Sequence, residues 1–243
     1  MSATTLRANA KLTLTLRVTG TRDDGYHLID AEMVALELHD VLTISPGDSL
    51  EAVGPFSAGM PTDDSNLVRK ALRLAGRTAA VRIDKQIPHG GGLGGGSADA
   101  AAVLRWAGFE DLGAASRLGA DIPFCLVGGR ARVRGIGEIV DPLAVSDEQF
   151  TLVVPPFGCS TPAVYRAWDE LGGPEGASGN DLEPAAIALE PRLAVWRQRI
   201  IEASGVVPTL AGSGATWFVR GAHPEMAEAL PEATVVVTRT DRP

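Results

Sequence analysis

The feature that most constrains the fold of this chain is a glycine-rich segment at residues 88–97, which contains six glycines and ends in Ser97. A strand-like run precedes it at residues 79–84, and an alanine-rich stretch with helical character follows at residues 98–107. Serine is a common N-cap residue, and Asp99 suits the positive end of a helix. The pattern therefore predicts a strand, a glycine loop and a helix in that order, with Ser97 as the N-cap.

This loop suits the binding of a triphosphate. Glycines leave backbone N–H groups unobstructed, and a helix N-terminus carries roughly half a positive charge. The alternative interpretations are a flexible linker and a steric device for close packing. A linker does not usually lie directly between a strand and a capped helix, so we favour phosphate binding. The segment matches neither the P-loop pattern nor a clean dinucleotide-binding fingerprint.

Elsewhere, strand-like and helical segments alternate. Residues 11–18 alternate between polar and apolar, which predicts a half-buried strand with Lys11 and Thr13 together on its wet face. Asp24-Gly25 predicts a turn. Further strands are expected at 34–44, 150–154, 215–219 and 235–238, and helices at 66–76, 162–171 and 185–203. This order predicts an α+β or mixed α/β fold, divided at a polar stretch into domains at residues 1–145 and 146–243.

Composition narrows the class of protein. The net charge of −8 over 243 residues argues against a general nucleic-acid binder. Cys125 and Cys159 show no paired spacing, which argues against a disulfide framework and favours a reducing cytoplasm. No apolar run approaches the roughly 20 residues that span a bilayer, and no signal peptide is evident. We therefore expect a soluble, cytoplasmic protein with no membrane partner.

Phosphoryl transfer to a hydroxyl also needs a group that takes the proton and a cation near the transferred group. Asp121 is a carboxylate among apolar and small residues, and Lys11 lies on the first strand. The residues alone do not show that the two meet. Taken singly, Asp121 would more often be a turn or cap residue, and Lys11 a solvated strand residue.

Seven motifs, in chain order, resemble those of the GHMP kinase superfamily and, within it, of the 4-diphosphocytidyl-2-C-methyl-D-erythritol kinase family. The turn Gly-Thr-Arg-Asp-Asp-Gly-Tyr-His resembles one specific to that family rather than to the superfamily. The motifs lie at residues 8–12, 20–27, 88–98, 118–124, 160–165, 180–184 and 211–215. They cover nearly the whole chain.

The resemblance implies a two-domain GHMP kinase fold of the α+β class. Its N-terminal domain would resemble ribosomal protein S5 domain 2, and its C-terminal domain would be ferredoxin-like, with the site between them. The implied activity is ATP-dependent phosphorylation of the 2-hydroxyl of 4-diphosphocytidyl-2-C-methyl-D-erythritol, a step of non-mevalonate isoprenoid synthesis. ATP and Mg²⁺ are the implied cofactors, a small molecule is the partner, and we expect a monomer or weak homodimer. The alternatives are another GHMP-type polyol kinase and a catalytically silent nucleotide-binding homologue.

The resemblance also assigns residues. It implies Asp121 as general base with Lys11 as its cationic partner, Tyr26 and Tyr165 on either side of the cytosine, and His27 at the cytosine edge. Without it, these aromatic residues would be turn and core residues. The implied nucleotide set is Asn66, Lys85, Pro88, Gly90, Gly91, Gly92, Leu93, Gly94, Gly95, Gly96, Ser97 and Ala98. The implied substrate set is Thr13, where the family usually has asparagine, with Tyr26, His27, Thr161, Pro162, Tyr165, Gly212, Ser213 and Gly214; the last three would otherwise form a tight turn.

Overall fold

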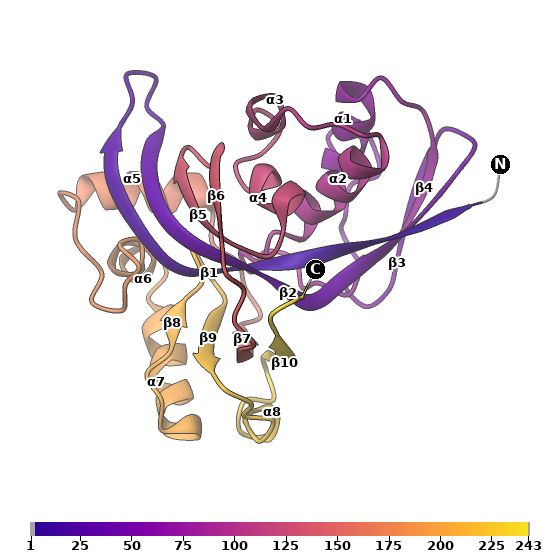
Figure 1. The fold of residues 1–243 in the computed structure, drawn as a ribbon. Helices are drawn as coiled ribbons and strands as arrows, with labels where there is room; N and C mark the ends of the chain where they lie inside the picture. The colour runs from indigo at the N-terminus through magenta and orange to yellow at the C-terminus, as the bar shows by residue number, and fades with distance from the viewer. Residues whose placement is uncertain (1–2, 243) are drawn as a thin grey trace.

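A computed structural model describes residues 3–242. Its first sheet has the strand order β3-β4-β2-β5-β6, with β1 paired to β2; β3 and β4 are parallel, and the other pairs are antiparallel. Figure 1 shows β1 and β2 as two long curved strands that cross the molecule. The strands are β1 (Thr4–Thr21), β2 (His27–Ser45), β3 (Ser49–Val53), β4 (Ala80–Asp84), β5 (Arg130–Gly135) and β6 (Ile139–Leu143).

The predicted strand at residues 11–18 is confirmed as part of β1, but its predicted wet face is wrong. Lys11 and Thr13 do share a face, and both are almost fully buried, with 5% and 1% of their surfaces exposed. The glycine loop covers that face, since a Cβ on Gly94 would lie 2.7 Å from Lys11 Cγ, and the Lys11 N–H donates to the Leu93 carbonyl of the same loop at 3.0 Å. Alternation alone cannot distinguish a face covered by solvent from one covered by a distant loop.

Four helices pack on one side of the first sheet: α1 (Leu67–Leu74), α2 (Gly95–Trp106), α3 (Leu112–Ser116) and α4 (Ile122–Val127). The buried alanines of α2, Ala98 and Ala100–Ala102, let this helix lie close to its neighbours. The prediction of Ser97 as N-cap is wrong. The N-cap is Gly94, whose φ of 71° is a left-handed conformation that favours glycine, and Ser97 lies in the first turn.

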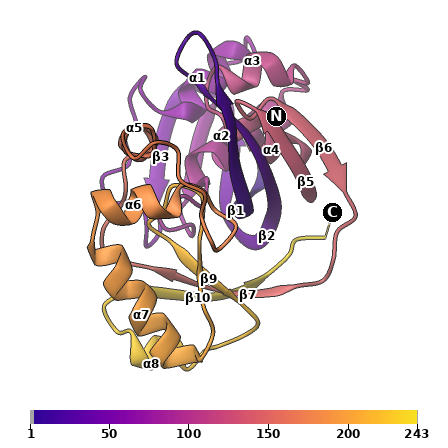
Figure 2. The same ribbon diagram turned by 90° about the vertical axis from the view of Figure 1, so that its left-hand side faces the viewer.

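The second sheet is antiparallel with the order β10-β7-β9-β8. Figure 2 shows it beside α7 and α8, below the first sheet. Its strands are β7 (Gln149–Val154), β8 (Thr209–Leu210), β9 (Trp217–Arg220) and β10 (Thr234–Arg239), and the helices of this half are α5 (Thr161–Glu170), α6 (Glu183–Leu189), α7 (Arg192–Ser204) and α8 (Met226–Ala229). The single helix predicted at 185–203 is wrong: Glu190, which precedes Pro191, leaves the helical region at φ −130° and ψ 84°. Proline disfavours the α conformation in the residue before it, so the helix breaks at Glu190 and the chain forms two helices, α6 and α7.

The later part of the chain returns to the β1–β2 strands at two places. Leu16 exchanges backbone hydrogen bonds with Gly179 and Asp181, both at 2.9 Å, and the Asp241 N–H donates to the Ala35 carbonyl at 2.8 Å. The first contact holds the segment after α5 beside the strand that carries Lys11. No helix in the described residues is both long and apolar enough to cross a bilayer. The division at residues 145/146 remains our proposal.

Candidate active site

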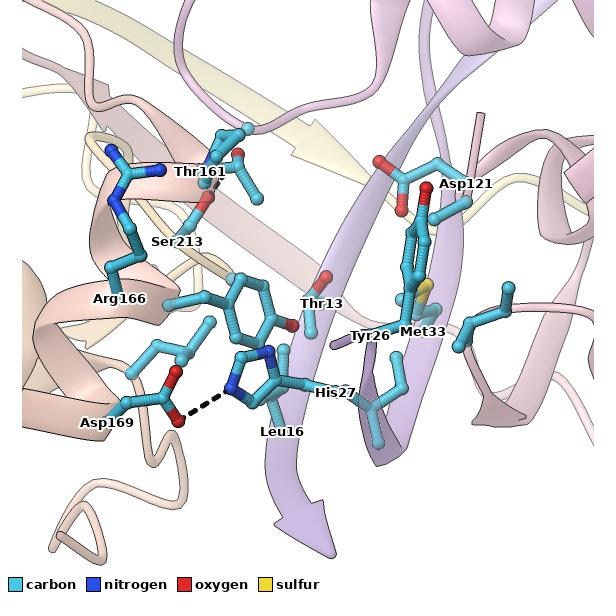
Figure 3. A pocket seen from close by; sticks show the side chains of 18 of the residues that line it. Thr13, Leu16, Tyr26, His27, Met33, Asp121, Thr161, Arg166, Asp169 and Ser213 are labelled. Atoms are coloured by element: carbon cyan, nitrogen blue, oxygen red, sulfur yellow. Dashed lines mark hydrogen bonds and ion pairs between the residues drawn. The ribbon is translucent and has the colours of Figure 1, made fainter. Parts of the chain in front are cut away.

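A cavity of about 480 Å³ lies where the two sheets and α5 meet, and both halves of the chain line it (Figure 3). Its lining side chains come from β1, the β1–β2 turn, β2, the segment before α4, α5 and the Gly212–Ser213 loop. They include both predicted catalytic residues and most of the predicted substrate set. The lining residues are Lys11, Thr13, Leu16, Gly25, Tyr26, His27, Ile29, Met33, Gly92, Ala120, Asp121, Ile136, Thr161, Pro162, Tyr165, Arg166, Asp169, Leu182, Gly212 and Ser213.

The structure brings the predicted catalytic pair together at one end of this cavity. Lys11 Nζ lies 3.4 Å from Asp121 Oδ2 and donates a 3.1 Å hydrogen bond to Thr13 Oγ1. The Lys11 side chain is 6% exposed, whereas that of Asp121 is 31% exposed. Asp121 directly precedes α4, but among the described residues its carboxylate makes no capping bond to that helix. The Asp121 carboxylate is therefore available to a ligand, whereas the Lys11 ammonium is buried and held by its hydrogen bond to Thr13.

The glycine loop combines close packing with free donors. A Cβ on Gly92 would lie 3.0 Å from the carbonyl oxygens of Ala211 and Gly214, and one on Gly94 would lie 2.7 Å from Lys11 Cγ. Within residues 3–242, no backbone hydrogen bond is donated by the N–H groups of residues 90–97, and the first bond of α2 runs from Ala98 to Gly94 at 2.8 Å. Close packing therefore explains why Gly92 and Gly94 are glycines. The loop also presents a row of backbone N–H groups that are unpaired in the described residues, as the binding of an anion requires.

Asn66 and Lys85 lie near this loop with their side chains engaged locally. Asn66 caps α1 through a 2.8 Å bond from Val68 N, and its amide donates to the Pro61 carbonyl. Lys85 Nζ is buried between Asp40 and Asp99, at 2.7 Å from Asp99 Oδ2, and lies 3.3 Å from where Gly95 would carry a Cβ. This places the ion-paired ammonium directly under the first turn of α2. Nucleotide binding by Asn66 and Lys85 stays a prediction.

The buried carboxylates around Lys85 perturb one another. Burial, with the neighbouring charge of Asp40, raises the pKa of the Asp99 carboxyl to about 7, against the opposing effect of Lys85. Burial lowers the pKa of Lys85, but the two carboxylates outweigh it and the net shift is upward. Asp99 Oδ1 has no hydrogen-bond partner in the described residues. The single positive charge of Lys85 can therefore balance only one negative charge on the two buried carboxyl groups of Asp40 and Asp99.

Aromatic residues line a further part of the cavity wall. The His27 ring stacks on Tyr165 at a centroid distance of 4.7 Å and meets Trp168 edge-on at 5.7 Å. Burial, and then the charge of Asp121, raise the pKa of the Tyr165 hydroxyl, so it stays protonated. Tyr26 is 60% exposed and stands beside Met33 and Asp121 in Figure 3. In the described structure Tyr26 and Tyr165 do not stack on each other, and the His27 ring covers one face of Tyr165.

The second glycine loop contacts α5 and closes the cavity. Ser213 Oγ and Thr161 Oγ1 lie 2.7 Å apart, and Asn180 Nδ2 donates to the carbonyls of Leu210 and Gly212 at 2.8 and 2.7 Å. Gly214 is part of the loop but lies outside the cavity lining, where a Cβ would meet Leu210 at 3.3 Å. Asn180 belongs to a predicted motif and acts here by fixing the loop backbone.

Sequence reasoning missed several lining residues, above all Met33, Arg166 and Asp169. A signal for the last two was present in the sequence. Positions three and four residues apart share a helix face, so Pro162, Tyr165, Arg166 and Asp169 face the same way once α5 is recognised. Met33 gave no comparable signal, because it is one apolar residue in a mostly apolar strand.

Comparisons with known proteins show which proteins this chain is similar to. Residues 66–129 match the family model described as the GHMP kinases N terminal domain. A 4-diphosphocytidyl-2-C-methyl-D-erythritol kinase of Paracoccus denitrificans is 44% identical over 235 residues, covering 87% of this chain and 84% of the relative. One of Pelotomaculum thermopropionicum with the same name is 38% identical, covering 98% of both chains.

Two solved structures have the same fold as this chain. A crystal structure of 4-(cytidine 5'-diphospho)-2C-methyl-D-erythritol kinase superposes with a TM-score of 0.76 at 31% identity, covering 98% of this chain and 100% of the other. A homoserine kinase from Cytophaga hutchinsonii superposes with a TM-score of 0.65 at 16% identity, covering 99% and 95%, and shares the fold alone. The predicted two-domain GHMP kinase fold of the α+β class is confirmed.

Proposed function

Because this chain belongs to the family of 4-diphosphocytidyl-2-C-methyl-D-erythritol kinases, we propose that its cavity phosphorylates the 2-hydroxyl of that diphosphocytidyl alcohol with ATP. The observation that carries the proposal is the Lys11–Asp121 pair, 3.4 Å apart at the end of a cavity that also includes Gly92 of the glycine loop. A carboxylate, an ammonium and a glycine loop thus lie at one place, and these are the kinds of group that phosphoryl transfer uses as base, cation and phosphate holder. The step belongs to the non-mevalonate route to isoprenoid precursors.

Asp121 acts as the general base in this proposal. Its carboxylate takes the proton of the 2-hydroxyl as the alcohol oxygen bonds to the γ-phosphorus, and the bond from that phosphorus to the ADP oxygen breaks. Lys11 stabilises negative charge on the attacking and transferred oxygens. The hydrogen bond to Thr13 Oγ1 and the packing against Gly94 fix the ammonium in place.

The glycine loop holds the phosphates. The free N–H groups of residues 90–97 and the N-terminus of α2 supply donors and positive potential without a mobile side chain. Pro88, Leu93 and Ala98 belong to the same binding segment, and Asn66 and Lys85 shape its surroundings. ATP is expected of a kinase, and this loop is where its phosphates would bind.

Magnesium is part of the proposal, and the residues present are compatible with it. Mg²⁺ in kinases is usually bound by phosphate oxygens, water and one or two protein oxygens. The described residues contain no cluster of three or more His, Cys, Asp or Glu side chains that would form a metal site by themselves. Ser97, in the first turn of α2, and Asp121 could each supply one oxygen to an ion that arrives with ATP. The bound ion would neutralise phosphate charge.

The cytidine end of the substrate would lie against α5 and the β1–β2 turn. Tyr165 and Tyr26 offer aromatic faces for the base, and His27 offers a ring nitrogen to its edge. Thr161, Pro162 and Ser213 line the path between the base and Lys11 and would contact the diphosphate or the alcohol. A cavity of about 480 Å³, lined by both the aromatic residues and the Lys11–Asp121 pair, has the size of a small-molecule site.

An ADP-release assay with a panel of acceptors tests this function. The panel contains the diphosphocytidyl alcohol, homoserine, mevalonate and a blank without acceptor. We expect ADP release above the blank with the diphosphocytidyl alcohol alone. Preferential release with another alcohol would favour a different GHMP-type kinase. Binding of ATP with no acceptor-dependent release would favour a silent homologue. The cytoplasmic location and the monomeric or weakly dimeric state remain predictions.

A further inference from the structure

His27 is held at the cavity wall by a carboxylate from the opposite half of the chain. His27 Nε2 lies 2.8 Å from Oδ1 of Asp169, on α5, and the two side chains are 10% and 50% exposed. Figure 3 shows this bond at the cavity wall, with the His27 side chain extending toward Asp169 on α5. Tyr165 and Trp168 contact the same ring, so its orientation is fixed on three sides.

The other ring nitrogen of His27 is available to a ligand. No hydrogen bond to Nδ1 exists within residues 3–242, and His27 lines the cavity. The charged side chains that share this cavity are Asp169 and Arg166 on α5, Asp121 before α4 and Lys11 on β1. Of these, Asp169 alone is hydrogen-bonded to the imidazole in the described structure.

The Asp169 contact decides which nitrogen carries the proton. An ionised carboxylate accepts hydrogen bonds and donates none, so the His27 nitrogen that faces it must be the N–H. In a neutral imidazole the other nitrogen then carries a lone pair. Asp169 therefore makes Nδ1 of His27 an acceptor toward the cavity.

We propose that Asp169 is a positioning residue that fixes His27 as a hydrogen-bond acceptor and so selects a 4-aminopyrimidine over a 4-ketopyrimidine in the substrate. The inference rests on the proposed function and deepens it. Cytosine presents an exocyclic amine, which donates to Nδ1. Uracil presents a carbonyl oxygen at the same place, which would face a lone pair. Two acceptors that face each other in a buried site form no hydrogen bond, although both have lost their contacts with water. The pairing of uracil with this nitrogen is therefore unfavourable.

Steady-state kinetics with matched cytidyl and uridyl substrates test this proposal. The assay is run with both substrates at one pH and one ionic strength. The variants are Asp169→Asn, Asp169→Glu and Glu170→Gln. An asparagine side chain can donate or accept, so His27 is free to take either tautomer. Glutamate keeps the carboxylate, and Glu170, the exposed next residue on α5, controls for the loss of one negative charge.

We expect Asp169→Asn to lower the cytidyl-to-uridyl ratio of kcat/KM by roughly tenfold or more, since one neutral hydrogen bond is exchanged for a mismatch. The change should lie in KM for the nucleotide acceptor, with KM for ATP unchanged. Asp169→Glu should restore most of the ratio, and Glu170→Gln should keep it. The ¹⁵N spectrum of the imidazole should show the proton on Nε2 in the wild type and a mixture of tautomers in Asp169→Asn.

An unchanged ratio in an active Asp169→Asn variant would overturn the proposal, and so would equal losses with both substrates. A wild-type chain that turned over neither nucleotide would instead contradict the proposed function. In that case the ¹⁵N spectrum still decides the inference: a wild-type His27 protonated on Nδ1 alone would overturn it.

Discussion

The carbon chain of Lys11 lies against the bare α-carbon of Gly94, where a Cβ would come within 2.7 Å of Lys11 Cγ. This contact connects the glycine loop to the proposed catalytic pair. Gly94 is at once the N-cap of α2 and the surface on which the lysine rests, so a single glycine couples the position of the loop to that of the ammonium. The position also has a φ of 71°, a second reason for glycine.

Gly94→Ala should therefore destabilise the chain and displace Lys11. The left-handed conformation costs an alanine about 1–2 kcal/mol, and the clash with Lys11 should add about 1–3 kcal/mol. Gly205→Ala is the matched control, because its φ is 70° and nothing in the described chain lies within 4 Å of the added methyl. The difference between the two variants in the loss of free energy of urea unfolding gives the cost of the clash, separate from that of the left-handed conformation. Equal losses of stability would show that Lys11 does not press on this site.

Asp121→Asn should keep the fold and ATP binding but lower kcat by about 10²–10⁴-fold, the usual contribution of a general base. The amide has nearly the same shape and cannot accept the proton of the 2-hydroxyl. ATP affinity measured by calorimetry serves as the control. A near-normal kcat would remove Asp121 from the role of base.

Lys11→Met should lower kcat by about 10²–10³-fold, the range for losing one preorganised donor to developing charge. Methionine keeps the apolar stem that packs on Gly94, so the change isolates the ammonium. The split between kcat and KM for ATP is the measurement. A raised KM with an unchanged kcat would make Lys11 a ground-state binding residue.

Thr13 holds Lys11 as well as lining the cavity, since its hydroxyl accepts the 3.1 Å bond from Nζ. Thr13→Val keeps nearly the same shape but removes the hydrogen-bond acceptor. Hydrogen bonds to charged groups are worth about 1.5–3 kcal/mol, so kcat should fall by roughly tenfold to a hundredfold. Thr13→Ser keeps the hydroxyl and should retain most activity. Thr13→Asn should leave ATP affinity unchanged and improve kcat/KM for the diphosphocytidyl alcohol by a factor of a few, because an amide reaches farther. If valine and serine behaved alike, the hydroxyl would have no role in catalysis.

The Asp40–Lys85–Asp99 cluster predicts a pH-dependent stability. Because burial, above all, raises the pKa of Asp99 to about 7 from its usual 3.8, the folded state binds the proton more tightly than the unfolded state. The resulting stabilisation is complete below about 3.8 and is lost as the pH rises through about 7. Asp99→Asn cannot ionise, so its stability relative to wild type should increase between pH 5 and pH 8. Urea unfolding at both values measures this.

Asp23→Asn, in the exposed β1–β2 turn, controls for the loss of one surface charge. A stability difference between wild type and Asp99→Asn that stays the same at both pH values would show that the Asp99 carboxyl is ionised throughout this range.

Much of this fold could be predicted from the sequence, because local patterns encode strands, helices and the glycine loop. The strand at 79–84, the helices at 66–76 and 162–171, and the helix after the glycine loop all form within a few residues of the prediction. The short elements β3, β5, β6, β8, α3 and α4 were not predicted, since segments this short carry little periodicity.

The break between α6 and α7 follows a local signal, the proline after Glu190. The other errors arise where distant segments meet. The burial of Lys11 comes from a loop that lies far along the chain, and the cap at Gly94 comes from a close approach that favours glycine over serine. The pairing of His27 with Asp169 joins β2 to α5, and no local pattern records it. The meeting of Lys11 with Asp121 was implied by the resemblance to a known family rather than by periodicity.

The most direct test of the central claim is ³¹P NMR of the product formed from ATP and 4-diphosphocytidyl-2-C-methyl-D-erythritol. We predict one new phosphomonoester signal on the 2-oxygen, an intact diphosphate, one ADP per product, and loss of the signal with Asp121→Asn. Phosphate released to water, a phosphoryl group on another hydroxyl, or an unchanged signal with Asp121→Asn would contradict the assignment of this cavity and its Lys11–Asp121 pair.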